Sequence, residues 1–204
     1  MGKTSAVITY LEEMRNALKE HIGELKSKEN GTGKNLVKPF SDISNKVNIV
    51  IPITHCIQER LQHFKINTPA TPKDIWAQVL KTVYRDFLFV ATMSTIEYYF
   101  PRILLQYPKY QSSRVDKKTM HDLIDWASRE GILADEYLWR FANYARNDIV
   151  HRNAFAKSAM KSPILDFPIE MVEGQQLSGK LRSLLSLTKH VETSFFNAVF
   201  SLQE

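Results

Sequence analysis

The sequence predicts an all-α protein, a bundle of about five to six helices. Apolar residues recur every three or four positions through most of the chain, which is the period of amphipathic helices. No segment alternates apolar and polar residues as a half-buried strand does. With 204 residues, 44% of them hydrophobic, the chain is long enough to bury a substantial core.

Two helices are expected in the N-terminal part of the chain. The first spans about residues 5–28, and a loop marked by glycines and a proline follows over 29–39. The second spans 41–65. Pro52 lies inside it and predicts a break or kink, because proline removes a backbone donor and clashes with the preceding turn.

A proline- and threonine-rich segment, 67–72, is the expected boundary between two parts of the chain. Residues 1–66 are predicted to form an N-terminal helical extension or subdomain, and residues 71–204 a helical bundle. Thr71 and Pro72 suit a helix start, with a hydroxyl cap followed by proline at the first helical position.

The helices of the bundle are predicted from their periodicity and their end signals. Phe100-Pro101 should end or kink the first of them, and Gly131 should close the second as its C-terminal glycine. The expected helices span 71–99, 116–130, 135–156 and 177–202.

Charge and cysteine content narrow the class of protein. The net charge of +5 and pI near 9.2 favour polyanionic partners such as RNA, although the basic residues are dispersed, as in many proteins that bind no nucleic acid. A single cysteine excludes an intrachain disulfide and a thiolate metal cage. The start lacks the apolar core of a signal peptide, and no apolar run is long enough for a bilayer. We expect a cytoplasmic protein without membrane association, metal or cofactor.

The most informative motif is the stretch from Arg146 through Asn147 to His151. Arginine can clamp a phosphate with its fork of donors, and histidine exchanges a proton near neutral pH. Spacing alone is weak, because ten arginines and six histidines predict about one accidental arginine followed by histidine after four to six residues. The chain contains three such pairs: Arg15 with His21, Arg114 with His121, and Arg146 with His151.

Helical geometry separates the third pair from the others. At about 100° per residue, one face of the 135–156 helix is apolar and should meet the core. That face comprises Leu138, Phe141, Ala142, Ala145 and Ile149. The opposite face comprises Arg140, Asn143, Tyr144, Asn147 and His151. It is either an ordinary solvated face or a second binding surface, and the nearby aromatics Tyr137, Trp139 and Tyr144 favour an interface or a nucleic-acid groove.

Arg-Asn-x-x-Val-His, placed late in a helical chain after a long apolar helix that contains Glu97, resembles the HEPN superfamily. Catalytic members of that superfamily carry Arg, four to six residues, then His, often with Asn directly after the Arg. The resemblance covers residues 71–204. It implies a HEPN-like helical bundle, a homodimer whose motifs meet across the interface, and metal-independent endoribonuclease activity in toxin or antiviral defence systems.

The resemblance also implies roles for individual residues. Arg146, Asn147 and His151 map to the active-site motif, and RNA-binding contacts are expected from Arg140, Tyr144 and Arg152. Besides RNA, an antitoxin or regulatory protein is an expected partner. Some family toxins have a tyrosine two residues after the histidine, where an antitoxin modifies it. Asn153 occupies that position here, which departs from that style of regulation.

The chemistry itself connects the motif to a dimer. Attack of a 2′-hydroxyl on the adjacent phosphate needs a base, an acid and stabilisation of phosphorane charge, and none of these requires a metal. One chain offers one motif histidine, whereas a two-fold dimer supplies two histidines and two arginines around one phosphate. The proposed mechanism and the proposed assembly therefore require each other.

Glu97 is the expected supporting residue. It lies eleven positions after Asp86, so an α-helix would place both carboxylates on nearly the same face. A carboxylate in apolar company needs a cationic partner. Arg146 is the expected partner of Glu97, where the pair would orient the guanidinium. An exposed helix edge or an unrelated structural ion pair is the alternative.

Three functions are consistent with these residues. The first is the HEPN-type endoribonuclease. The second is a non-catalytic HEPN-like scaffold module that binds RNA or protein through the same polar and aromatic face. The third is a helical structural subunit without a nucleic-acid role.

Overall fold

The computed structural model describes residues 2–29, 34–63, 78–166, 168–179 and 181–202. The expectation of an all-α bundle is confirmed, because helices make up nearly all of the regular structure. The elements are α1 (Gly2–Glu29), α2 (Lys38–His63), η1 (Val83–Val90), α4 (Ala91–Leu104), α5 (Pro108–Gln111), η2 (Val115–Lys117), α6 (Met120–Arg129), α7 (Glu136–Arg152), β1 (Ile169–Glu170), β2 (Ser178–Gly179) and α8 (Leu181–Ser201).

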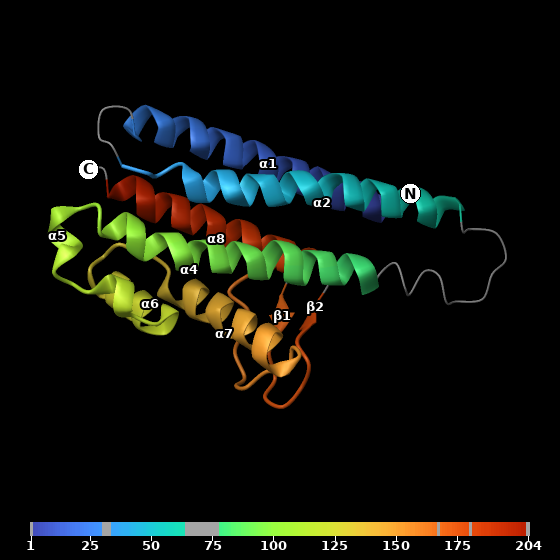
Figure 1. Ribbon diagram of the computed structural model, residues 1–204. Coiled ribbons are helices and arrows are strands. Elements are labelled where there is room, and N and C mark those ends of the chain that lie inside the picture. The colour runs from blue at the N-terminus through green and yellow to red at the C-terminus, as the bar shows by residue number, and fades with distance from the viewer. Residues whose placement is uncertain (1, 30–33, 64–77, 167, 180, 203–204) are drawn as a thin grey trace.

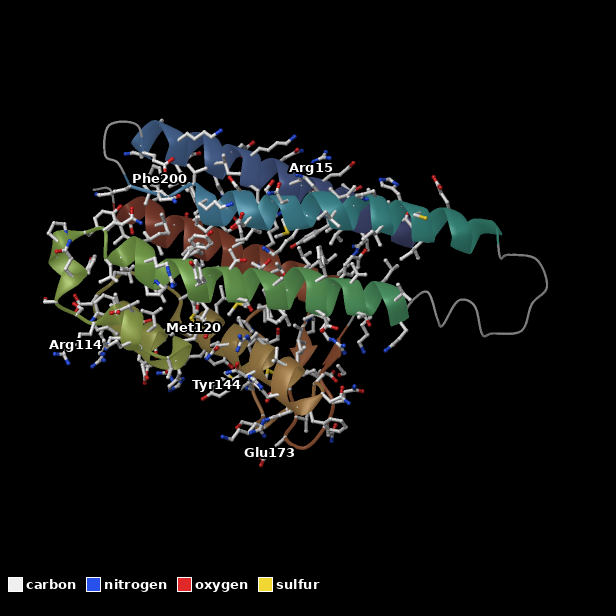
Figure 2. All side chains as sticks on the ribbon, in the orientation of Figure 1. Arg15, Arg114, Met120, Tyr144, Glu173 and Phe200 are labelled. Carbon is white, nitrogen blue, oxygen red and sulfur yellow. The ribbon has the colours of Figure 1, made fainter. Side chains whose placement is uncertain are left out.

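The long helices form three layers (Figure 1). Helices α1 and α2 pair along their length, α4 and α8 lie beneath them, and α6 and α7 form the opposite layer. Side chains fill the space between the layers (Figure 2). The N-terminal pair shares one hydrophobic core with the rest, since the Phe40 ring stacks on that of Phe195 with centroids 5.1 Å apart. The expected boundary at 67–72 lies outside the described residues.

Helices α1 and α2 form where their periodicity predicts them, and Leu11, Leu18 and Leu25 of α1 are fully buried. Of the predicted break or kink at Pro52, the break is wrong, because α2 runs through Pro52 to His63. Pro52 itself is exposed, whereas Ile51 and Thr54 beside it are buried. Water can therefore donate a hydrogen bond to the backbone carbonyl that the proline leaves without a donor. Burial of the nearby residues keeps the helix continuous.

The next helix ends later and is less regular than predicted. It is helical from the first described residue, 78, through η1 and to Leu104, so the expected end at Phe100-Pro101 is wrong. Both residues are buried, and their packing keeps the helix intact. Its expected start at Thr71 lies outside the described residues. The π-helical segment η1 was not predicted, because no sequence period distinguishes it from an α-helix.

Three helix ends differ from expectation. Helix α6 begins at Met120, not 116, because Thr119 caps it by accepting from the Asp122 N–H at 3.2 Å. Gly131 follows it with a φ of 72°, as predicted. Helix α7 ends at Arg152, where Asn153 turns left-handed with a φ of 50°. Helix α8 begins at Leu181, because 178–179 pairs antiparallel with 169–170 in a two-stranded sheet too short to show alternation.

Candidate functional site

The apolar face of α7 packs into the core as predicted, and all five of its residues are buried. The buried arc is wider than expected, since Trp139 and Asn143 are buried too. The Trp139 indole donates to Ser194 Oγ at 2.9 Å, which anchors it on α8. Trp139 and Asn143 are thus not part of an exposed binding face. Arg140, Tyr144 and Asn147 are partly exposed, and His151 is exposed.

The guanidinium of Arg146 bridges α7 and α4. Its Nη2 donates to Glu97 Oε2 at 3.0 Å, so the predicted partnership with Glu97 is confirmed. Its Nη1 donates to Asn147 Oδ1 at 2.8 Å. Nε is buried and has no hydrogen-bond partner in the described part of the chain. Because a guanidinium carries five N–H groups, two donors on the Nη atoms remain for a ligand.

Asn147 and His151 are one helical turn apart, about 6 Å along α7. The Asn147 carbonyl oxygen accepts from Arg146, which leaves its amide N–H groups for another acceptor. His151 makes no hydrogen bond or ion pair with any described residue. The last two turns of α7 therefore carry an oriented guanidinium, an amide and an unengaged imidazole, with Arg146 and His151 five residues apart and about 140° apart around the helix.

A buried carboxylate that the sequence reading missed fixes this end of α7. Asp148 is 2% exposed, and its Oδ2 accepts from the Lys157 backbone N–H at 3.2 Å. Its Oδ1 lies 3.6 Å from Arg152 Nε. Asp148 therefore fixes the backbone that follows the turn at Asn153. Arg152, which was expected to contact RNA, is paired with Asp148. The motif order Arg-Asn-Asp gave no sign of this role.

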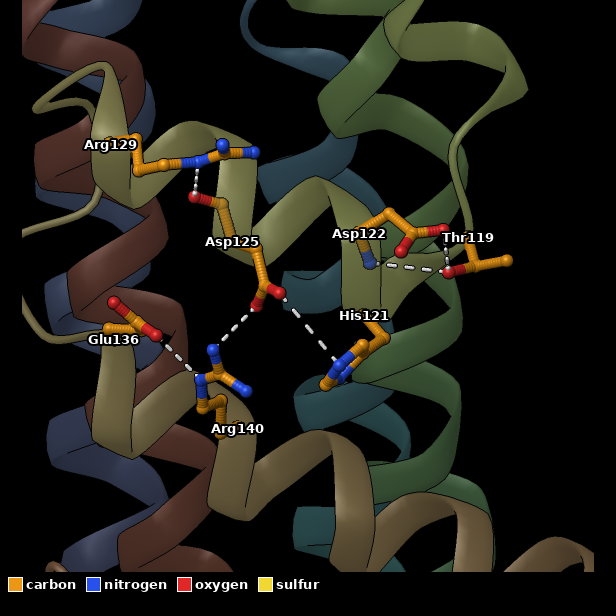
Figure 3. A network of polar contacts seen from close by, with 7 residues as sticks. All are labelled: Thr119, His121, Asp122, Asp125, Arg129, Glu136 and Arg140. Carbon is orange, nitrogen blue, oxygen red and sulfur yellow. Dashed lines mark hydrogen bonds and ion pairs between the residues drawn. The ribbon is translucent and has the colours of Figure 1, made fainter.

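Arg140 lies at the other end of α7 in a polar network with α6 (Figure 3). Its Nε donates to Glu136 at 2.6 Å, and its Nη2 lies 2.9 Å from Asp125. The hydrogen bond that Arg140 donates to Glu136, together with the charge of Asp125, raises the pKa of Arg140. His121 Nε2 lies 3.8 Å from Asp125, and the His121 ring meets that of Tyr144 edge-on at 6.3 Å. Arg140 is thus already held by two carboxylates of its own chain.

The pair Arg15 and His21 belongs to a different environment. His21 Nδ1 lies 2.9 Å from Oε1 of Glu192, whose side chain is fully buried, and the imidazole stacks on Phe196 at 3.8 Å between centroids. This contact joins α1 to α8. Sequence reading could not find it, because nothing in the pattern links positions 171 residues apart. His21 thus has a structural role in packing α1 against α8.

Among the described residues, no group of three or more His, Cys, Asp or Glu side chains is placed to hold a metal ion. None of the helices in the described part of the chain is long and apolar enough to cross a membrane. Comparison with protein-family models, with curated proteins and with solved structures found no match. The HEPN resemblance stays a prediction from the motif.

Proposed function

We propose that this protein is a metal-independent endoribonuclease of HEPN type, acting as a homodimer. The observation that carries the proposal is the group at the end of α7. There Arg146 is oriented by Glu97 and Asn147, and His151, five residues further along α7, has no partner in the described part of its own chain. Structural histidines are usually held by a carboxylate or carbonyl, as His21 is.

The proposed reaction breaks one phosphodiester bond by internal transfer. A base takes the proton of a 2′-hydroxyl, the 2′-oxygen bonds to phosphorus, and the 5′-oxygen leaves with a proton from an acid. The products are a 2′,3′-cyclic phosphate and a 5′-hydroxyl. His151 acts as acid or base, the remaining Arg146 donors stabilise the phosphorane oxygens, and Asn147 orients them.

The second acid–base group is assigned to His151 of a second copy. A two-fold axis through the site would bring two copies of the motif to one phosphate. Large apolar side chains beside His151 support an interface there, since Val150 is 46% exposed and Phe155 47% exposed. We assign the activity to a toxin or antiviral defence role in the cytoplasm, under control of an antitoxin or regulatory protein.

One observation favours the alternative, a non-catalytic HEPN-like scaffold module for RNA or protein. Arg140 and Arg152, which were expected to bind RNA, both lie against carboxylates of their own chain. A scaffold needs no free imidazole. The catalytic proposal rests instead on His151 following the oriented Arg146 and Asn147 on the same helix.

The test incubates purified protein with single-stranded RNA in excess chelator and identifies the product ends. The proposal expects cyclic phosphate ends, and His151→Ala should slow cleavage by about 10²–10⁴-fold. His55→Ala is the matched control, because His55 is also exposed but lies on α2 in the opposite layer. Equal cleavage by all three proteins, or none by a folded wild-type dimer, contradicts the proposal. Cleavage that occurs without chelator but is lost in excess chelator contradicts the metal-free mechanism.

A further inference from the structure

A basic pocket lies at the rim of α6, away from the Arg146 group. It has a volume of about 450 Å³. We name it the α6 pocket, and it is lined by Arg114, Lys117, Lys118, Asp122, Asp125 and Arg129. Four of these six side chains are cationic, which already favours an anionic ligand.

Both carboxylates of the α6 pocket are engaged by their own chain (Figure 3). Asp122 accepts from the Thr119 hydroxyl at 2.7 Å, and this bond lowers the pKa of Asp122. Asp125 is paired with Arg140 at 2.9 Å. By contrast, none of the four cations lies within ion-pair distance of a carboxylate in the described part of the chain. The α6 pocket therefore keeps a positive charge that its own acids do not neutralise.

Between the α6 pocket and α7 lie a partly exposed histidine and a partly exposed tyrosine. His121, next to Asp122, meets the Tyr144 ring at 6.3 Å. Tyr144 is one turn before Asn147 and about 10 Å along the helix from His151. Figure 2 shows Arg114 and Tyr144 on the same side of the molecule, opposite Arg15. His121 and Tyr144 thus link the residues around the α6 pocket to α7.

We propose that the α6 pocket anchors backbone phosphates of an RNA strand whose more distant phosphate reaches His151. Tyr144 lies between the two and supplies a ring on which a base can stack. RNA fits better than a free phosphate ion, because the four cations are spread along the rim and the path continues over an aromatic side chain. The path to His151 rests on the proposed function, whereas RNA binding in the α6 pocket does not.

The test measures binding of the full chain to a single-stranded RNA whose 2′-hydroxyls are all methylated, so that cleavage cannot interfere. Fluorescence anisotropy is recorded over a salt series for wild type and K117Q/K118Q. Loss of two phosphate contacts should weaken binding about tenfold and reduce the slope of log K against log salt by about 1.4. The matched control, K19Q/K26Q, removes two exposed lysines of α1 in the opposite layer and should change binding less than about twofold.

Unchanged binding by K117Q/K118Q, or an equal loss in K19Q/K26Q, overturns the anchor. So does displacement of the RNA by millimolar inorganic phosphate. The same proteins are assayed for cleavage of unmodified RNA. If wild type cleaves and His151→Ala does not, while K117Q/K118Q binds normally, the anchor fails and the endoribonuclease stands. If the α6 pocket binds RNA and wild type cleaves nothing, the anchor stands and the endoribonuclease fails.

Discussion

Helix α7 carries a similar set of residue types at each of its ends. Near its start, Arg140 meets Asp125, with His121 beside them. Near its end, Arg146 meets Glu97, with His151 one turn beyond Asn147. Each set has an arginine on α7, a carboxylate from a neighbouring helix and a histidine.

The two sets differ in how many partners the protein itself supplies. Arg140 has two carboxylates, and His121 has Asp125 and the Tyr144 ring. Arg146 has one carboxylate and one amide oxygen, and His151 has no partner in the described part of the chain. The first set joins α6 to α7, whereas the second keeps donors and an imidazole for a ligand. Residue type and spacing do not make this distinction, but the count of internal partners does.

The largest expected difference in cleavage rate is between Arg146→Ala and Arg140→Ala. Arg146→Ala removes the donors assigned to the phosphorane and should slow RNA cleavage by about 10²–10³-fold. Arg140→Ala should leave the cleavage rate within about threefold, because its guanidinium only joins α6 to α7. Initial rates on one RNA under chelator measure both. A slower rate for Arg140→Ala than for Arg146→Ala would reverse the assignment of the two sets.

Glu97→Gln tests whether Glu97 positions Arg146. Glutamine keeps a hydrogen-bond acceptor but removes the charge that holds the guanidinium, so we expect kcat to fall about tenfold with little change in KM. The thermal midpoint should stay close to wild type, because the pair is partly exposed. A raised KM with unchanged kcat would instead place Glu97 in substrate binding.

Asp125→Asn should disrupt the set near the start of α7 and leave the set with Arg146 and His151 intact. It removes the ion pair with Arg140 and weakens the contact with His121. Partly exposed pairs of this kind contribute about 0.5–1 kcal/mol each, so unfolding in urea should require a slightly lower denaturant concentration. At saturating RNA, where binding in the α6 pocket does not limit the reaction, the cleavage rate should not change. Stability equal to wild type would show that the α6–α7 network adds nothing to folding.

The smallest expected effect concerns pH. The Thr119 hydroxyl lowers the pKa of Asp122 below its ordinary value of 3.8. Because the folded pKa lies below the unfolded one, ionised Asp122 stabilises the protein above about pH 4, and this contribution is lost as pH falls through the folded pKa. Asp122→Asn should therefore lose less stability than wild type between about pH 4 and pH 2. Urea unfolding curves at both pH values provide the measurement. An equal loss of unfolding free energy in wild type and Asp122→Asn contradicts the prediction.

The core face of α7 and the Glu97–Arg146 contact are predictable from sequence. The first follows from a regular period, and the second from a carboxylate on an apolar helix, which needs a cationic partner. Burial of Trp139 and Asn143 is not predictable in this way, because it depends on α8, whose Ser194 lies 55 residues from Trp139. The π-helical turn is hidden for another reason. Asp86 lies inside it and pairs with its neighbour Arg85, whereas Glu97 lies beyond it in α4 and reaches Arg146.

The most direct test of the difference between the two sets compares His151→Ala with His121→Ala. Both variants are assayed for RNA cleavage in excess chelator, after their dimer content and thermal midpoints have been matched to wild type. We predict a loss of at least about 100-fold for His151→Ala and less than about threefold for His121→Ala. Equal rates for the two variants would contradict the claim that the unengaged histidine at the end of α7 is the reactive one.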